Sequence, residues 1–124
     1  MSAVIGIGTD LVEIERVAAA IGRHGARFAE RIMTASELAR CDVTDPRAVA
    51  KSFAAKEAVA KALGTGFRRG VSWQDIEITR DSLGAPVVSL QGAAAARMSE
   101  LGGSRLLLSL SDERTHVLAF AVMT

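Results

Sequence analysis

The sequence predicts an α+β fold, in which a mainly antiparallel sheet packs with a long central helix and shorter helices. One uninterrupted helical pattern occupies the middle of the chain, over residues 46–63. Two later stretches, 76–90 and 106–123, each consist of two strand-like segments around a polar turn, which is typical of antiparallel hairpins. Strands and helices do not alternate regularly, so the pattern does not favour a parallel α/β sheet.

Length and composition indicate an ordinary globular protein. The chain has 124 residues, of which 49% are hydrophobic and 23% charged. We expect one domain over residues 1–124, which by the usual scaling buries roughly two-thirds of the surface of its unfolded chain. The formal net charge is +1, so any anion site must be local. Neither disorder nor a basic tail that binds nucleic acid is expected.

The cysteine count and the hydropathy pattern bear on the compartment. Cys41 is the only cysteine, which excludes an internal disulfide and a zinc site built from cysteines. A reducing cytoplasm is the simplest location. No apolar run reaches the roughly 18 residues that span a bilayer. Residues 1–6 carry no positive region ahead of their apolar residues, so no signal peptide is expected. We therefore expect a soluble cytoplasmic protein with neither a membrane nor nucleic acid as partner.

The N-terminal segment predicts a strand followed by a helix. Residues 3–9 alternate isoleucine with glycine, and such glycines let another backbone or a ligand come close. We expect this strand to end at Asp10, because apolar residues recur at helical spacing over 11–21. Asp10 and Glu13 then have the form of a capping pair at the helix start. An N-cap is thus one interpretation of Asp10, and an acidic functional site is the other.

Two further helices begin at recognisable capping residues. Thr34 and Glu37 have the spacing of a capping box, which predicts a short helix behind them. Asp45 followed by Pro46 predicts the start of the long helix, and Gly64 predicts its end.

The long helix carries three charged residues in informative positions. Lys56 projects between Val49 and Leu63 on the apolar face, where its ammonium is desolvated unless an anion or a cleft receives it. Glu57 and Lys61 stand one turn apart on a different side. The simplest interpretation is a core helix with one surface ion pair between Glu57 and Lys61.

The loop at 64–70 contains three glycines and two arginines. Backbone N–H groups and guanidinium groups in such a loop are able to hold phosphate oxygens, although a simple turn is the alternative. Beyond it, we expect a hairpin over 76–90 and an alanine-rich helix over 92–101. The strands of the last hairpin are 106–111 and 116–123, and the second is apolar on both faces. Helices must cover part of that surface, and a neighbouring subunit is a candidate for the rest.

Together these features predict a phosphate site. Asp10 and Glu57 supply carboxylates, and cations and a glycine-rich loop lie close to Glu57 in sequence. Magnesium in proteins takes one or two carboxylates and completes its shell with phosphate oxygens and water. If the fold brings Asp10 and Glu57 together, they suit a magnesium ion held against a diphosphate.

Two long segments, 6–14 and 53–66, closely resemble the two signatures of holo-[acyl-carrier-protein] synthase, the small bacterial type of 4′-phosphopantetheinyl transferase. The resemblance runs the full length of the chain, because 30–37, 84–86 and 109–114 also fall where that family has counterparts. It implies transfer of the phosphopantetheine arm of coenzyme A to a serine hydroxyl of apo acyl carrier protein, with release of adenosine 3′,5′-bisphosphate. It also implies a homotrimer with coenzyme A in clefts between subunits, and a place in fatty acid biosynthesis and lipid metabolism.

The resemblance assigns roles to individual residues. Asp10 and Glu57 correspond to the magnesium ligands, and Glu57 to the carboxylate that accepts the serine proton, directly or through a metal-bound water. Lys61 corresponds to a lysine that neutralises the phosphates, and Lys56 to a companion phosphate lysine or a structural one. The residues that it places around coenzyme A are Lys56, Lys61, Gly64, Thr65, Gly66 and Ser109. Those that it places against the acidic carrier protein are Arg16, Arg23 and Arg27.

The chain departs from the family at two places. Ser52 stands where members often carry arginine, and Lys51 is a candidate substitute. Residues 107–109 read Leu-Leu-Ser where the family often has His-Val-Ser, so no histidine role transfers. His24 and His116 are left out of the mechanism.

Two other function classes fit the residues less well. A metal-dependent nuclease usually presents its acidic and lysine residues on a strand, and this chain lacks a basic stripe with aromatics. A non-catalytic module that docks carrier proteins would have no reason to keep Asp10, Glu57 and Lys61 together.

Overall fold

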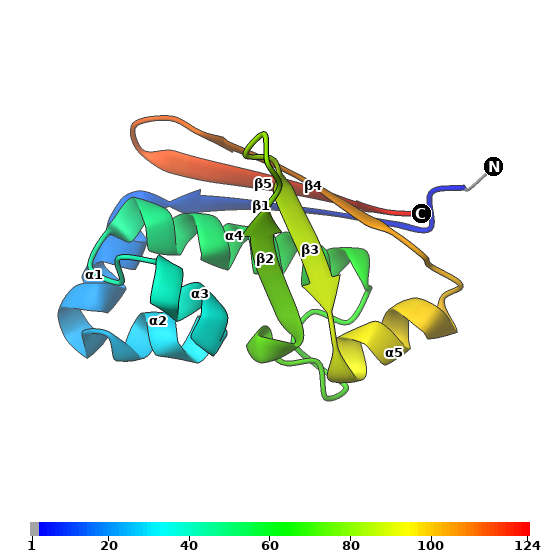
Figure 1. Ribbon diagram of the computed structural model, residues 1–124. Coiled ribbons are helices and arrows are strands. Elements are labelled where there is room, and N and C mark those ends of the chain that lie inside the picture. Colours follow the sequence, from blue (N-terminus) through cyan, green and yellow to red (C-terminus); the bar gives the residue numbers. More distant parts are fainter. Residues whose placement is uncertain (1–2) are drawn as a thin grey trace.

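A computed structural model describes residues 3–124 (Figure 1). Its elements are β1 (Gly6–Glu13), α1 (Ile14–His24), α2 (Arg27–Ile32), α3 (Ala35–Arg40), α4 (Pro46–Ala62), the 3₁₀ turn η1 (Trp73–Asp75), β2 (Ile76–Arg80), β3 (Pro86–Leu90), α5 (Gly92–Glu100), β4 (Leu106–Asp112) and β5 (His116–Met123). Strands β1, β5 and β4 form an antiparallel sheet in that order, and β2 pairs with β3 in a second one. The predicted α+β class is confirmed.

Helix α4 is the centre of the molecule, and its ends are those that the sequence predicts. The Asp45 side chain accepts a hydrogen bond from the Arg47 backbone N–H at 3.0 Å, and Pro46 is the first helical residue. Gly64, at φ 78°, takes the left-handed conformation that closes the helix. The helix contributes nine buried residues and packs against the inner face of the large sheet (Figure 1).

Two glycines allow β1 to lie directly on α4. A Cβ atom at Gly8 would clash with the carbonyl oxygen of Ala58, and one at Gly6 with that of Ala62. The N-terminal glycines thus admit another backbone, which was one of the two alternatives expected from the sequence. Their small size sets how closely strand and helix approach.

The expected end of the first strand at Asp10 is wrong. Strand β1 continues to Glu13, and Asp10 pairs with Ala119 in its middle. Helix α1 begins at Ile14, and its N-cap residue Glu13 makes no side-chain capping bond. Over so short a stretch, Leu11, Val12 and Ile14 fit both a strand and a helix period. The backbone hydrogen bonds that β5 offers decide for the strand.

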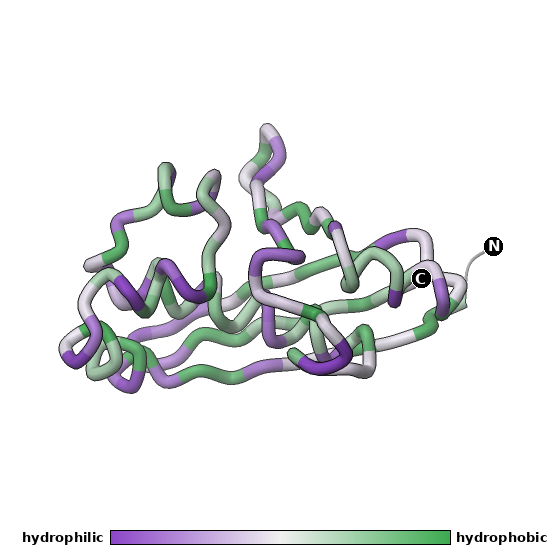
Figure 2. Tube along the Cα trace, turned by 90° about the horizontal axis from the view of Figure 1, so that it is seen from below, coloured by the Kyte–Doolittle hydropathy of each residue, from purple (hydrophilic) through white to green (hydrophobic). Residues whose placement is uncertain are grey.

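The large sheet has one covered and one uncovered face. The side chains of β5 that face α4 are fully buried, from Val117 to Met123. The opposite face, which we call the outer sheet face, carries large apolar side chains with 40–66% of their surface exposed. They are Ile7, Leu11, Leu107, Leu118 and Phe120. Strand β5 is therefore apolar on both faces, as the sequence indicates, and Figure 2 shows how hydrophobic residues prevail along the strands.

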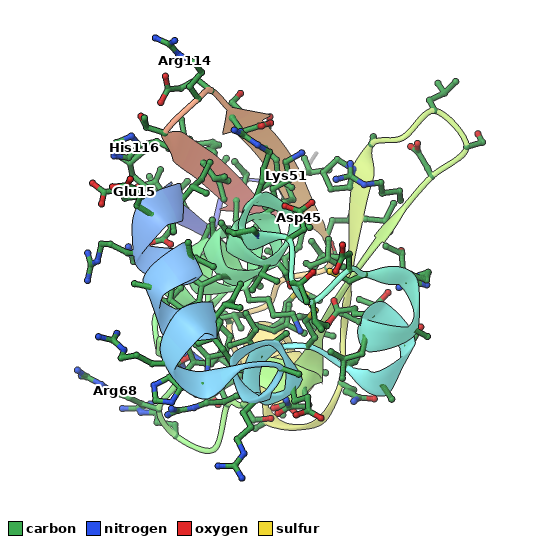
Figure 3. All side chains as sticks on the ribbon, turned by 90° about the vertical axis from the view of Figure 1, so that its left-hand side faces the viewer. Glu15, Asp45, Lys51, Arg68, Arg114 and His116 are labelled. Carbon is green, nitrogen blue, oxygen red and sulfur yellow. The ribbon has the colours of Figure 1, made fainter. Side chains whose placement is uncertain are left out.

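The hairpin of β2 and β3 projects from the body of the molecule (Figure 3). Asp81 accepts backbone hydrogen bonds from Leu83 and Ala85 in its turn, and Gly84 has φ 87°. The predicted hairpin, the α5 helix and the terminal hairpin are all present. Within residues 3–124, no helix is long and apolar enough to cross a membrane.

Candidate active site

The fold brings Asp10 and Lys61 into direct contact where β1 crosses α4. The Lys61 ammonium donates to Asp10 Oδ1 at 3.2 Å and to the Thr9 carbonyl oxygen at 2.9 Å. Asp10 lies on the inner face of the strand with 15% of its side chain exposed. Its second oxygen, Oδ2, is buried and has no hydrogen-bond partner among the described residues. Burying a carboxylate oxygen without a partner is costly, so this atom is poised for a ligand.

Glu57 belongs to the same cluster. Burial raises the pKa of its carboxyl, the Asp10 charge raises it further, and Lys61 opposes both. The surface ion pair expected between Glu57 and Lys61 is replaced by the contact of Lys61 with Asp10. Asp10 and Lys61 are thus in direct contact, and both charges influence the pKa of Glu57.

The donor set fits a magnesium ion. Asp10 offers a buried oxygen without a partner, and Glu57 adds a second carboxylate that Asp10 influences electrostatically. Within residues 3–124 no group of three or more histidine, cysteine, aspartate or glutamate side chains surrounds a metal position. Two carboxylates without further ligands suit a cation that takes its remaining oxygens from phosphate and water, rather than one held in a closed protein cage.

A cavity of about 540 Å³ opens beside Asp10. Two docking candidates, Arg16 and Arg23, line it, whereas Arg27 lies exposed at the start of α2. Its apolar side includes Phe28 and Phe53, whose rings stack at a centroid distance of 6.1 Å. The α1 arginines therefore border the same opening as Asp10.

Lys56 lies on another side of α4. Its side chain is fully buried, and its ammonium donates to Glu37 Oε1 at 2.7 Å and to the Trp73 carbonyl oxygen at 3.1 Å. Burial lowers the pKa of Lys56, and the bond to Glu37 opposes this shift. The anionic partner expected from the sequence is thus Glu37. Of the two roles considered for Lys56, phosphate binding and a structural role, this placement favours the structural role.

The glycine-rich loop forms a tight turn after α4. Gly66 has φ 58°, and its N–H donates to the Ala60 carbonyl oxygen at 3.1 Å. Thr65 is only 9% exposed, and its hydroxyl donates to the Gly66 carbonyl oxygen at 2.8 Å. Arg68 points away from the body (Figure 3). Turn geometry accounts for these glycines, and the phosphate role of the loop stays a prediction.

Comparison with known proteins identifies the family. The model of the 4'-phosphopantetheinyl transferase superfamily matches residues 6–121. The holo-[acyl-carrier-protein] synthase of Shewanella amazonensis is 53% identical over 122 residues, covering 97% of this chain and 98% of that protein. The chain belongs to the 4'-phosphopantetheinyl transferase superfamily. The resemblance inferred from the two signature segments is confirmed.

Solved structures of this superfamily share the fold. The crystal structure of holo-[acyl-carrier-protein] synthase from Neisseria meningitidis has a TM-score of 0.88 and 43% identity, covering 98% of this chain and 99% of that one. The Helicobacter pylori enzyme in complex with coenzyme A has a TM-score of 0.84 and 30% identity, with 95% and 99% coverage.

Ser109, which the resemblance places beside coenzyme A, is not brought to Asp10 by the fold of one chain. It pairs with Phe120 on the outer sheet face, whereas Asp10 pairs with Ala119 on the inner face. Ser109 is exposed there. Within one chain it therefore lies on the opposite side of the sheet from the acidic cluster.

Sequence reasoning missed a second cavity of this phosphopantetheinyl transferase, with a volume of about 530 Å³. Four basic side chains from α3, α4 and β2 line it: Arg40, Arg47, Lys51 and Arg80. Asp112 binds two of them, Arg47 at 2.7 Å and Lys51 at 3.5 Å. Ser52 also lines the cavity, and its hydroxyl has no partner among the described residues. No local motif unites these residues, so only the fold reveals the cluster.

Proposed function

We propose that the chain transfers the 4′-phosphopantetheine arm of coenzyme A to a serine hydroxyl of apo acyl carrier protein. The observation that carries the proposal is the cluster of Asp10, Glu57 and Lys61 at the crossing of β1 and α4. Membership of the transferase superfamily supports it, as does the holo-[acyl-carrier-protein] synthase of Helicobacter pylori in complex with coenzyme A.

In this reaction the serine oxygen bonds to the phosphorus that carries pantetheine. The bond from that phosphorus to the oxygen of adenosine 3′,5′-bisphosphate breaks, and the serine proton passes to Glu57. Lys61 stabilises the negative charge on the phosphoryl oxygens. Magnesium, held by Asp10 and Glu57, would neutralise the diphosphate when bound.

The arginines of α1 and α2 form the carrier-docking side of the site. Arg16 and Arg23 line the cavity beside Asp10, and Arg27 is exposed close by in sequence. Cations at the rim of a site raise the encounter rate with an acidic partner and fix its orientation. This arrangement favours a carrier protein that approaches over α1 and delivers its serine to Glu57.

The outer sheet face supports a homotrimer. It presents a row of exposed apolar side chains, of which Leu11 is 66% and Phe120 is 40% exposed. Such a patch marks an interaction surface. Assembly through it would bring Ser109 of one chain to a neighbour, so that coenzyme A lies between subunits with Gly64, Thr65 and Gly66 beside its adenosine. We place the enzyme in the cytoplasm and in fatty acid biosynthesis.

A mass-spectrometric assay tests the proposal. The pure protein, magnesium, coenzyme A and apo carrier proteins of the fatty-acid and polyketide types are incubated separately. We expect the mass of one phosphopantetheine to be added to at least one carrier, and expect EDTA to abolish the gain. The Glu57→Gln variant is the matched control. No mass gain on any carrier would refute the transferase proposal.

A further inference from the structure

The ion pair of Lys56 and Glu37 is the most deeply buried pair of charges in residues 3–124. Lys56 is fully buried, Glu37 is 5% exposed, and their charged atoms lie 2.7 Å apart. A pair this deep is seldom a source of net stability, because removing both charges from water costs about as much as their attraction returns. Its presence beside Glu57 therefore calls for another explanation.

The Glu37 carboxylate joins α3 to two segments that are distant in sequence, α4 and β2. Its Oε1 binds Lys56 of α4 and also accepts the local capping-box bond from the Thr34 backbone N–H at 2.7 Å. Its Oε2 accepts one from the Ile78 backbone N–H on β2, also at 2.7 Å. Lys56 donates in addition to the Trp73 carbonyl oxygen of η1. The pair thus fixes α4 against α3, η1 and β2 with directional bonds.

The opposite side of α4 is fixed by β1. The carbonyl oxygens of Ala58 and Ala62 leave no room for a Cβ atom at Gly8 or Gly6. Successive helical residues point about 100° apart, so Lys56 is directed to the α3 and β2 side while Glu57 belongs to the Asp10 cluster. A rotation or slide of α4 would alter the position of Glu57 relative to Asp10.

We propose that Lys56 and Glu37 are positioning residues that hold α4 so that Glu57 and Asp10 bind one divalent ion. The inference rests on the proposed function, which assigns those two carboxylates to the metal. Partners that orient a metal ligand typically change metal affinity or activity by about 10–100-fold when they are lost. Neither Lys56 nor Glu37 touches the substrate in this role.

The test variant is Lys56→Met, which replaces the ammonium with an apolar side chain of similar shape. Glu37 keeps its two backbone donors, Thr34 and Ile78, so its carboxylate is not left bare. Electron paramagnetic resonance measures the binding of Mn²⁺, used as a probe without coenzyme A or carrier. We expect affinity to fall about tenfold or more, kcat to fall similarly, and KM for the carrier to stay unchanged.

Two further variants separate positioning from general destabilisation. Ile32→Ala creates a core cavity on α2, where Ile32 is 2% exposed, and should lower the melting temperature without weakening Mn²⁺ binding. Glu37→Asp keeps the charge but shortens its reach by one methylene, so it should weaken Mn²⁺ binding even if Lys56→Met fails to fold.

The outcomes keep the two proposals apart. Wild-type Mn²⁺ affinity in folded Lys56→Met or Glu37→Asp would overturn the positioning role, as would an equal loss in Ile32→Ala. Failure of the wild-type protein to modify any carrier would refute the transferase proposal, while the Mn²⁺ measurements would still decide the role of the pair. A wild-type protein that binds no Mn²⁺ would overturn the positioning inference.

Discussion

Two charged clusters on adjacent residues of α4 differ in how their polar atoms are satisfied. Around Lys56, both oxygens of Glu37 accept hydrogen bonds, and the ammonium itself has two partners. Around Glu57, two carboxylates lie in one cluster, and Asp10 Oδ2 is buried without a partner among the described residues. The comparison teaches that the satisfied cluster belongs to the scaffold, whereas the unsatisfied one is prepared for a ligand.

The largest expected effect is the loss of activity when the unsatisfied cluster is changed. Glu57→Gln removes a proton acceptor and a metal ligand, so we expect kcat to fall on the order of 10²–10⁴-fold. Asp10→Asn should act in the same direction. Steady-state transfer kinetics measure this, with circular dichroism as a control for folding. Activity close to that of the wild-type protein in Glu57→Gln would contradict the assignment.

Changes to the satisfied cluster should lower stability in addition to weakening metal binding. Glu37→Gln leaves the Lys56 ammonium without a counter-charge in the core, and breaking a buried pair in this way costs about 3–5 kcal/mol of unfolding free energy. Urea unfolding measures the loss. Lys61→Met is the matched comparison, because the Lys61 side chain is 51% exposed and its loss should cost no more than about 1 kcal/mol. Equal losses in the two variants would remove the distinction between the clusters.

A change at the rim of the unsatisfied cluster should weaken binding of the carrier protein more than binding of coenzyme A. Arg16 lines the cavity beside Asp10, so Arg16→Glu places a repulsive charge in the path of an acidic carrier. We expect KM for the carrier to rise about tenfold, with KM for coenzyme A little changed. Kinetics with each substrate varied in turn separate the two. Loss of affinity for both in equal measure would argue against docking over α1.

The smallest expected effect is a gain in protein stability when the Glu57 carboxylate is removed by Glu57→Gln. Burial and Asp10 raise the pKa of this carboxyl, so the folded state disfavours its charge, and stability falls as the pH rises through the folded-state pKa. Glu57→Gln should therefore be the more stable protein in EDTA at neutral pH, and this advantage should vanish at acidic pH. Because Glu57 is only partly buried, screening limits the gain to about 1 kcal/mol or less, or about 2–5 °C in melting temperature.

Calorimetry at several pH values checks this effect. A lower melting temperature for Glu57→Gln at neutral pH in EDTA would show that the native carboxylate stabilises the protein without a metal.

Much of the fold follows from local chemistry in the sequence. The capping residues Thr34 and Asp45 and the glycine at 64 define helices α3 and α4 correctly, because their effects operate within one turn of helix. The desolvation argument for Lys56 correctly required a partner. The argument did not identify Glu37, because contacts between α3 and α4 depend on how the helices pack.

The sequence grouped Asp10, Glu57 and Lys61 but did not predict the contacts that these residues make. Asp10 was expected at the end of a strand, yet β5 extends β1 by bonding to residues 11–13. Lys61 was expected to pair with Glu57, which is nearby on the helix, but β1 brings Asp10 closer to it. The basic cavity around Arg47 and Arg80 joins three elements, so its assembly depends on tertiary packing alone.

A crystal structure of the protein grown with magnesium and coenzyme A bears most directly on the shared divalent ion. We predict one ion bound by an oxygen of Asp10 and an oxygen of Glu57, each at about 2.0–2.1 Å, with phosphate oxygens completing its shell. Side chains that stay apart, with the ion bound elsewhere in every subunit, would contradict the metal site and the mechanism built on it.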